Sequence, residues 1–194
     1  MKNKQQNIPI TQIKNQLLSS LNQKALVFVG LMGSGKSVIG KHVATILSLP
    51  FYDSDQEVEK AAQMTIVQLF ETYGESKFRT LEQKIILNII KKGPLILATG
   101  GGAYMNEDIR KAIHQNGISI WLKADLHVLI ERISGCCARP LLQTANPKET
   151  MQKLMEQRYP IYAQANLTIN NHEEHYHVVA YNVIQAVQRY LSIK

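Results

Sequence analysis

The chain has 194 residues, of which 45% are hydrophobic and 19% are charged, and its formal net charge is +7. This length and apolar content predict one α/β domain with a substantial core, and no apolar stretch approaches the length of a membrane span. The positive charge admits nucleic acid as a partner, but no run of lysines or arginines concentrates it. Such a pattern favours an enzyme whose ligands are anionic.

The cysteines and the amino-terminal stretch bear on location. The two cysteines, Cys136 and Cys137, are adjacent in the sequence. Adjacent cysteines rarely close a disulfide bond with each other, and a pair does not make a four-ligand zinc site alone. The first residues contain no apolar targeting segment, so we expect a protein of the reducing cytoplasm.

Residues 1–24 form a polar extension before the predicted domain, which covers residues 25–194. Lysine, asparagine and glutamine dominate this extension. Its apolar residues share one face of a short predicted helix: Ile13, Leu17, Leu18 and Leu21. We expect that face to pack either on the domain or on a partner.

A phosphate-binding motif follows the first predicted strand. Ala25–Val29 is an apolar run without alternation, as expected of a buried parallel strand. Gly30–Ser37 reads Gly-x4-Gly-Lys-Ser, the Walker A pattern, in which loop amides and Lys36 hold phosphates and the Ser37 hydroxyl binds Mg²⁺. Apolar residues recur at helical spacing after it. This order of strand, loop and helix predicts a nucleoside triphosphate site, the alternative being a glycine-rich turn that binds nothing.

Two carboxylates follow the second predicted strand. Leu49–Tyr52 is a short apolar run, and Asp53, Ser54 and Asp55 come directly after it. Open α/β sheets bind ligands at the carboxyl ends of their strands. Asp53 could therefore hold Mg²⁺ through water, and Asp55 could take a proton from a substrate hydroxyl. In the alternative, Asp53 or Ser54 only caps the helix that begins near Gln56.

Residues 56–92 predict more helix than a simple strand connection needs, with a break at Gly74. Apolar positions form one helical face before this glycine and another after it. An insertion of this kind beside the phosphate loop predicts a second wall for an acceptor substrate. Arg79 and Glu82 lie one helical turn apart, which by itself indicates a surface ion pair.

A run of glycines follows the third predicted strand. Leu95–Ala98 reads as a buried strand, and Thr99 leads into Gly100–Gly102. Three consecutive glycines cost conformational entropy on folding, and at the end of a strand they indicate close approach of the backbone to a ligand. A plain flexible loop is the alternative. A helix over residues 106–115 and a fourth strand over residues 118–122 are predicted next.

Two arginines stand out in the carboxyl-terminal third. Residues from about 136 to 148 are irregular and polar and contain Arg139. An arginine on a mobile segment suits a lid that closes over transferring phosphoryl groups. Arg158 lies toward the end of the helix that begins near Lys148, where it is either a carboxylate clamp or a solvated arginine.

A fifth strand is predicted over residues 167–169, before the last helix. His172, His175 and His177 lie between these two elements, together with two glutamates. Their spacing admits a metal site, but the polar context favours a solvated loop.

This set of motifs resembles the shikimate kinase family of P-loop enzymes over residues 25 to about 190. The resemblance rests on an ordered series: Gly-x4-Gly-Lys-Ser at 30–37, Asp53-Ser54-Asp55, Gly74-Glu75 with Phe78-Arg79-x-x-Glu82, Gly100-Gly101-Gly102, Arg139-Pro140-Leu141-Leu142 and Arg158-x-Pro160-x-Tyr162. It implies a three-layer α/β/α fold with a five-stranded parallel sheet, an acceptor-binding helical insert at about 54–92 and a lid at about 136–148. It also implies transfer of the γ-phosphate of ATP to the 3-hydroxyl of shikimate, a step of chorismate and aromatic amino-acid biosynthesis.

The resemblance further implies a role for each matching position. The implied ATP-binding residues, with Arg132 stacked on adenine and Arg139 on the lid, are Gly33, Ser34, Gly35, Lys36, Ser37, Val38, Arg132 and Arg139. The implied catalytic residues are Lys36, Asp55 and Arg139, and Ser37 and Asp53 serve Mg²⁺. The implied shikimate-binding residues comprise a proton acceptor, two carboxylate-binding arginines, a glycine turn and an apolar side: Asp55, Arg79, Arg158, Gly100, Gly101, Gly102, Ile66, Phe70 and Phe78. We expect a monomer that binds ATP and shikimate, with neither nucleic acid nor membrane as partner.

Two features depart from the family pattern, and three rival functions are weighed against it. Val38 replaces the usual hydroxyl residue after the Walker serine, which leaves its backbone N–H for the α-phosphate. The extension over residues 1–24 lies outside the pattern. The rivals are a gluconate kinase of the same architecture, a nucleotide-driven switch, and a nucleic-acid binder, whose binding would depend strongly on salt. The guanine-reading motif Asn-Lys-x-Asp is absent from the sequence, which argues against a GTPase switch.

Overall fold

The computed structural model describes residues 10–133, 146–172 and 174–192, with side chains described from residue 14 onward. Arg139, Cys136, Cys137 and most of the predicted lid lie outside these ranges. The elements in chain order are α1 (Ile10–Leu21), β1 (Ala25–Val29), α2 (Lys36–Leu47), β2 (Phe51–Asp53), α3 (Ser54–Ala62), α4 (Ile66–Ile89), the short 3-10 turn η1 (Ile90–Lys92), β3 (Ile96–Ala98), the 3-10 turn η2 (Ala103–Met105), α5 (Glu107–Asn116), β4 (Gly117–Lys123), α6 (Leu126–Ile133), α7 (Pro147–Tyr162), β5 (Leu167–Asn170) and α8 (Tyr176–Ser192).

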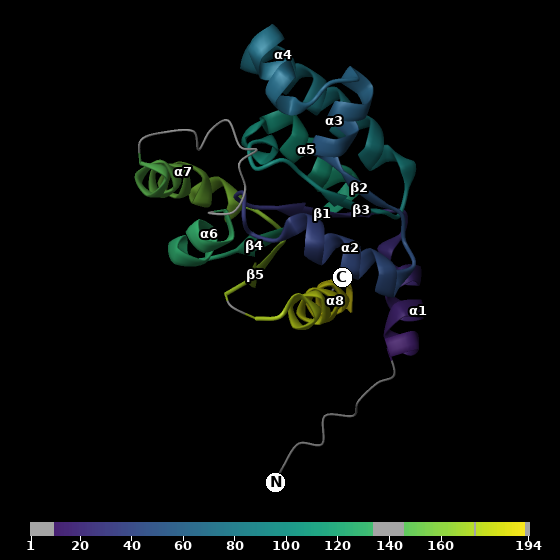
Figure 1. The fold of residues 1–194 in the computed structure, drawn as a ribbon. Coiled ribbons are helices and arrows are strands. Elements are labelled where there is room, and N and C mark those ends of the chain that lie inside the picture. The colour runs from purple at the N-terminus through teal and green to yellow at the C-terminus, as the bar shows by residue number, and fades with distance from the viewer. Residues whose placement is uncertain (1–9, 134–145, 173, 193–194) are drawn as a thin grey trace.

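The five strands form one parallel sheet in the order β2-β3-β1-β4-β5 (Figure 1). In the register of the central strand, Val27 lies opposite Leu97 of β3 and Ser119 of β4. β2 and β3 lie on one side of β1, and β4 and β5 lie on the other, so the strand order switches direction at β1. Ligands bind at such a switch point in open α/β sheets, so the phosphate loop lies where the fold favours a site. The predicted five-stranded parallel sheet is confirmed.

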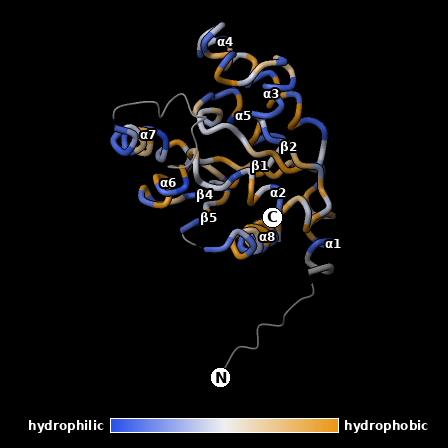
Figure 2. Tube along the Cα trace, in the orientation of Figure 1, coloured by the Kyte–Doolittle hydropathy of each residue, from blue (hydrophilic) through white to orange (hydrophobic). Residues whose placement is uncertain are grey.

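Side chains of the central strand point alternately into two hydrophobic layers. Ala25, Val27 and Val29 belong to the cluster beneath α4, α5, α6 and α7. Leu26 and Phe28 belong to the cluster beneath α1, α2 and α8. Both faces of the strand are therefore buried, which explains why its sequence is apolar without alternation. In Figure 2 the hydrophobic colour runs through the strands, while blue marks outward parts of the helices.

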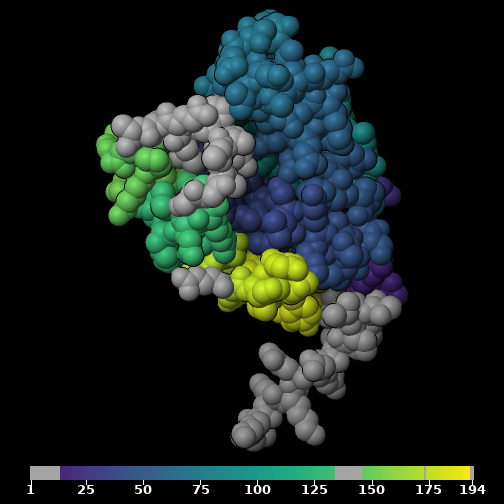
Figure 3. All heavy atoms as spheres, in the orientation of Figure 1, coloured from purple at the N-terminus to yellow at the C-terminus, as the bar shows by residue number. Residues whose placement is uncertain are grey.

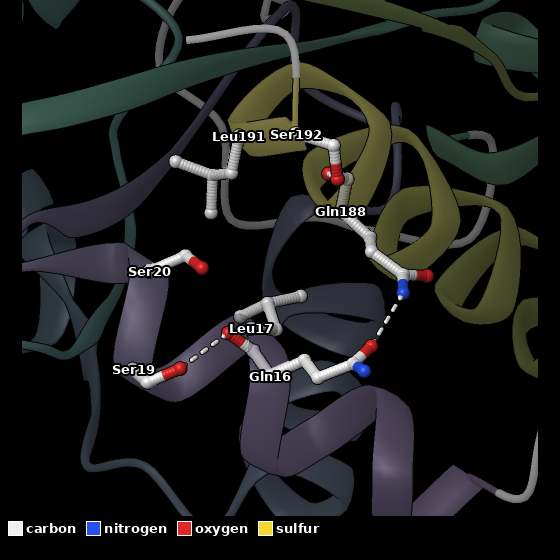
Figure 4. A pocket seen from close by; sticks show the side chains of 7 residues that line it. All are labelled: Gln16, Leu17, Ser19, Ser20, Gln188, Leu191 and Ser192. Carbon is white, nitrogen blue, oxygen red and sulfur yellow. Dashed lines mark hydrogen bonds between the residues drawn. The ribbon is translucent and has the colours of Figure 1, made fainter.

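The amino-terminal helix α1 packs on the domain. Its Leu17 and Leu21 are 1% and 0% exposed and belong to the same cluster as α2 and α8. At the rim of this contact the Gln188 amide donates to the Gln16 side-chain oxygen over 3.4 Å (Figure 4). Of the two partners considered for this helix, the domain is thus the one that its leucines contact.

The insert α3–α4 has a small core of its own at one end of the molecule (Figures 1 and 3). The core consists of buried Val58, Leu69 and Phe78, with neighbouring apolar side chains packed around them. The predicted break is a sharp bend at Gly74, whose φ of 76° and ψ of 171° lie outside the helical region. A positive φ of this size favours glycine, so the bend follows from the residue type.

Among the described residues, no helix is both long enough and apolar enough to cross a membrane. The part of the predicted lid that the structure describes is the start of α7. There the Asn146 side chain accepts a hydrogen bond from the Glu149 N–H over 3.2 Å, and Pro147 occupies the first turn. Both are favoured helix-starting residues at those positions.

Candidate active site

The phosphate loop between β1 and α2 uses glycine at its strained positions. Gly30, Gly33 and Gly35 have φ values of 139°, 79° and 88°. A Cβ on Gly30 would also lie 2.8 Å from the Leu122 carbonyl oxygen of β4. Other residues would therefore strain this loop, which holds the amino-terminus of α2 beside the sheet. The positive end of a helix dipole at this point favours an anion.

Lys36 is buried inside this loop, with only 8% of its surface exposed. Its Nζ donates to the Leu31 carbonyl over 2.7 Å and lies 3.4 Å from the Ser34 hydroxyl oxygen. The ammonium group is thereby held against the loop, where it adds to the charge of the helix end. By contrast, the Val38 side chain is 55% exposed and points away from the interior of the loop. It has no hydroxyl group, so only its backbone N–H can donate a hydrogen bond to a phosphate.

Asp53 links the second strand to the loop through separate oxygens. Its Oδ2 accepts a hydrogen bond from the Ser37 hydroxyl over 2.5 Å. Its Oδ1 accepts from the Asp55 N–H over 3.0 Å and so caps α3. Asp53 therefore caps α3, and its other oxygen at the same time faces the Walker serine. The paired oxygen donors of Ser37 and Asp53 are of the type that Mg²⁺ prefers.

The glycine run after β3 lies against two carboxylates. The Gly100 N–H donates to the buried Ser54 hydroxyl over 2.8 Å, which ties the run to the start of α3. A Cβ on Gly100 would lie 2.6 Å from both Asp55 Oδ1 and Glu82 Oε1. A side chain at Gly100 would therefore displace these carboxylates, and the run is packed against them instead of forming a plain flexible loop.

Two arginines from different helices meet the same glycine run. A Cβ on Gly102 would lie 2.6 Å from Arg79 Nη2, so the guanidinium group of α4 lies directly on that glycine. Arg158 of α7 donates from Nη1 to the Gly101 carbonyl over 3.0 Å. The turn thus brings together two cations that are distant in the sequence. Asp55, at the start of α3, lies against the same turn.

Arg79 is held in place by acidic side chains on both sides. Its Nη1 lies 2.8 Å from Glu82 Oε2 and its Nη2 lies 3.1 Å from Glu75 Oε1. Glu82 is 1% exposed, so this contact is a buried ion pair and the surface-pair interpretation is wrong. These two contacts orient the guanidinium group of Arg79 and hold it against the glycine turn.

Glu82 is a site residue to which the sequence analysis gave no binding role. Burial raises the pKa of its carboxyl, the Arg79 guanidinium opposes that shift, and the Asp55 charge adds to it. Among the described residues, its Oε1 has no hydrogen-bond partner. A buried acceptor without a partner is costly, so this oxygen lowers the stability of the folded chain.

An apolar surface borders the Arg79 side of the site. The Phe70 and Phe78 rings pack with centroids 4.8 Å apart, and Ile66 belongs to the same cluster. Arg79 Cζ lies 4.9 Å from the centroid of the Phe78 ring, within the range of a cation–π contact. The three predicted apolar residues therefore share one cluster, and Phe78 lies against the predicted arginine.

Tyr162 is a second residue whose contact the sequence did not predict. It lies one helical turn after Arg158, and its hydroxyl also donates to the Gly101 carbonyl. The ring is fully buried, and this burial raises the pKa of the Tyr162 hydroxyl far above its ordinary value. The spacing of four residues on one helix is the signal that could have paired it with Arg158.

The end of β5 supports the nucleotide side of the loop. Asn171 is 2% exposed and its side-chain amide donates to the Ser34 carbonyl over 2.7 Å. Arg132 of α6 donates to the His172 carbonyl over 2.7 Å and lies 3.5 Å from the Gly33 carbonyl oxygen. Arg132 thus lies beside the phosphate loop. Asn171 was missed, although its place directly after a strand is itself a signal.

The three histidines that follow β5 do not form one site: His172 and His175 precede α8, and His177 lies in its first turn. His172 Nδ1 lies 2.9 Å from Asp125 Oδ2, while the His175 and His177 rings stack on each other. Within the described ranges, no group of three or more His, Cys, Asp or Glu side chains is arranged to hold a metal ion. A metal site built from these three histidines is therefore not observed.

Comparisons with known proteins agree on one family. A family model described as shikimate kinase matches residues 32–188. The shikimate kinase of Bartonella henselae is 71% identical over 190 residues, which cover 98% of this chain and 90% of that protein. The solved structure of the shikimate kinase from Acinetobacter baumannii in complex with shikimate has a TM-score of 0.85 and 33% identity, covering 91% of this chain and 98% of that one.

The rival function, gluconate kinase, is also represented among solved structures of similar fold. A gluconokinase from Sinorhizobium meliloti has a TM-score of 0.59 at 15% identity, covering 88% of this chain and 95% of that one. That likeness shows a shared fold alone. Because the family model covers most of the chain and the relatives match it nearly end to end, the chain belongs to the shikimate kinase family.

Proposed function

We propose that the chain catalyses transfer of the γ-phosphate of ATP to the 3-hydroxyl of shikimate at the carboxyl edge of its sheet. The observation that carries this proposal is the meeting of Arg79 and Arg158 on one glycine turn, beside Asp55. A small carboxylated polyol needs a cationic clamp, an acceptor for its hydroxyl and an apolar side, and these residues supply all three. Arginine suits the clamp because its planar fork matches a carboxylate.

On the nucleotide side, Lys36 and the loop amides from Gly33 to Val38 hold the phosphates. The buried ammonium group stabilises charge that spreads over the transferring group. Arg132 stacks on the adenine. Arg139 of the predicted lid, which lies outside the described residues, supplies a further positive charge to the phosphates.

Ser37 and Asp53 would hold Mg²⁺, Asp53 through water. Their oxygens, 2.5 Å apart, are hard donors of the kind this ion takes, and Mg²⁺ usually keeps several waters with few protein ligands. When bound, the ion would neutralise phosphate charge.

On the acceptor side, Arg79 and Arg158 bind the carboxylate of shikimate. Asp55 accepts the proton of the attacking hydroxyl, and the backbone of Gly100–Gly102 contacts the ring hydroxyls. Ile66, Phe70 and Phe78 form the apolar side of the pocket. Glu82 keeps Arg79 oriented from behind, because its Oε2 is 2.8 Å from the guanidinium.

The chain is further proposed to act as a monomer in the cytoplasm. Residues 25–194 form the catalytic domain, and the segment before them serves through α1 to support it. The burial of Leu17 and Leu21 favours this view of α1. Light scattering coupled to gel filtration tests the oligomeric state, with one chain mass expected.

The test of the proposed function is a coupled assay of ADP release with shikimate, with gluconate and with no acceptor. ADP should be released rapidly with shikimate alone, and phosphorus NMR should show one phosphate ester on the 3-hydroxyl. Lys36→Met serves as the matched control, because it removes the loop charge but keeps the acceptor pocket. It should still bind shikimate yet lose turnover by several powers of ten, on the order of charge-stabilisation effects. ADP release that is equal with gluconate would overturn the substrate assignment.

A further inference from the structure

A pair of histidines joins α2 to α8 away from the site described above. His42 Nε2 and His177 Nδ1 face each other at 2.5 Å, and the centroids of their rings are 4.1 Å apart. The two residues are 135 positions apart in the sequence, so the fold alone brings them together. Their helices lie against each other in the space-filling view, with α8 directly below α2 (Figure 3).

Aromatic neighbours hold this histidine pair on the surface. The edge of Tyr176 meets the His42 ring with centroids 5.3 Å apart, and the His175 ring stacks on His177 at 4.7 Å. His177 is exposed, and His42 is partly so. The two facing nitrogens are therefore oriented by packing and remain open to water on one side.

We propose that His42 and His177 form a two-histidine site for a divalent transition ion of the zinc, nickel and copper class. Imidazole nitrogen is a preferred ligand of these ions, and two such nitrogens from different helices make a chelate. Within the described residues no third His, Cys, Asp or Glu side chain completes the group. Water fills the remaining positions, so the site is accessory and reversible.

The competing arrangement for this pair is a hydrogen bond between the two ring nitrogens that face each other. A bound ion would take the place of that hydrogen bond, because imidazole binds a metal ion through an unprotonated ring nitrogen.

The geometry requires a small movement for an ion to enter. Zinc–nitrogen distances of about 2.0–2.1 Å place two nitrogens of a tetrahedral ion about 3.3 Å apart. The observed separation is 2.5 Å. The rings must therefore part by about 0.8 Å, which a side-chain torsion at the surface supplies. A bound ion would then cross-link α8 to the helix that begins at the phosphate loop.

The experiment is a calorimetric titration of Zn²⁺ into the full chain without an affinity tag and without nucleotide, since ATP itself binds zinc. The wild type should bind one equivalent. His42→Ala and His177→Ala should each weaken binding by about tenfold or more, because one chelating nitrogen is lost. His114→Ala and His172→Ala are matched controls that remove exposed histidines elsewhere, and they should bind like the wild type.

A second readout reports the ligands directly. Copper bound to the wild type should show two equivalent nitrogens in its electron paramagnetic resonance spectrum, and His42→Ala should show one. Zn²⁺ should also raise the thermal unfolding midpoint of the wild type and leave that of His42→Ala unchanged. Wild-type affinity in His42→Ala, or a loss confined to His175→Ala and His177→Ala, would overturn the proposal. So would wild-type binding no tighter than that of the single-histidine variants.

Discussion

At Asp53 the two carboxylate oxygens have separate partners, and substitution can separate the two roles. Asp53→Asn keeps an oxygen that caps α3 but removes the charge next to Ser37. Asparagine is as good a cap as aspartate, so the free energy of unfolding should change little. The Mg²⁺ concentration needed for half-maximal turnover should rise.

Asp53→Ala is the companion variant, because it removes the cap and the charge together. Its free energy of unfolding should fall by about 1 kcal/mol beyond that of Asp53→Asn. Chemical denaturation and a Mg²⁺ titration of turnover measure the two effects. Equal Mg²⁺ dependence in wild type and Asp53→Asn would mean that this carboxylate does not serve the ion.

The buried carboxyl of Glu82 predicts a pH dependence of stability. Burial raises its pKa in the folded state, with Arg79 opposing the shift. Protonation of Glu82 therefore stabilises the folded state below the ordinary pKa of glutamate, and this stabilisation is lost as pH rises through the raised pKa of the folded state. Glu82→Gln does not lose stability in this way, because glutamine does not titrate. The stability of the wild type minus that of Glu82→Gln should therefore fall as pH rises from about 4 to 7.

Urea unfolding at a series of pH values measures this difference. Glu75→Gln is the control, because Glu75 also pairs with Arg79 but its own side chain is 57% exposed. It should show a much flatter dependence. A wild-type advantage that grows with pH would indicate that the ion pair with Arg79 dominates and that the pKa is lowered.

Among the elements, α4 and α7 act together through the arginine that each presents to the glycine turn. Arg79→Ala and Arg158→Ala should each weaken shikimate binding by about 30-fold or more, as expected for about 2–5 kcal/mol when a charge in a partly dry pocket loses a partner. The affinity for ATP should change little. Because both arginines are proposed to bind the same carboxylate, the double variant should lose less than the sum of the single losses.

Calorimetric titration of shikimate and of ATP into each variant tests the clamp. Arg189→Ala, on α8 at the surface, is the matched control that removes an arginine from elsewhere. Unchanged shikimate affinity in both single variants would show that the carboxylate binds at another place.

The bounds of a strand were predictable when the local residue pattern alone determines them. The apolar run Ala25–Val29 was predicted residue for residue, because a central strand is apolar throughout. The second strand was predicted over Leu49–Tyr52, but it covers Phe51–Asp53. Its limits are set by pairing with β3, since the Pro50 carbonyl accepts from the Ile96 N–H over 2.8 Å, and a local pattern does not encode such pairing.

For the molecule as a whole, α1 is a structural part of the fold. Leu21→Ala should lower the free energy of unfolding by about 2–5 kcal/mol, because Leu21 is fully buried against the α2–α8 layer. Ser20→Ala, an exposed neighbour on the same helix, should change it by less than about 0.5 kcal/mol. Thermal and chemical denaturation compare the two. Equal stability in both variants would mean that α1 detaches without cost.

The parts of the site that consist of contiguous sequence motifs were predictable, and the parts that depend on contacts between distant residues were not. The loop, the aspartate pair and the glycine run are contiguous signals, and each lies at the edge of the sheet that its position after a strand indicates. Glu82 and Asn171 were missed as site residues because their contacts span the chain. Glu82 faces Gly100 and Asn171 bonds to Ser34, and local spacing identifies neither partner, although the place of Asn171 directly after a strand did indicate the edge of the sheet.

The absence of side chains at the glycine turn has a consequence for inhibition. A Cβ on Gly100 or Gly102 would lie 2.6 Å from a charged group that shikimate recognition is proposed to need. A competitive inhibitor that took its contacts from this backbone would therefore meet a surface that a substitution at these glycines can reshape only by displacing Asp55, Glu82 or Arg79. Inhibitors anchored on the Phe70 side would lack that protection, because an apolar side chain can be exchanged for another of similar size.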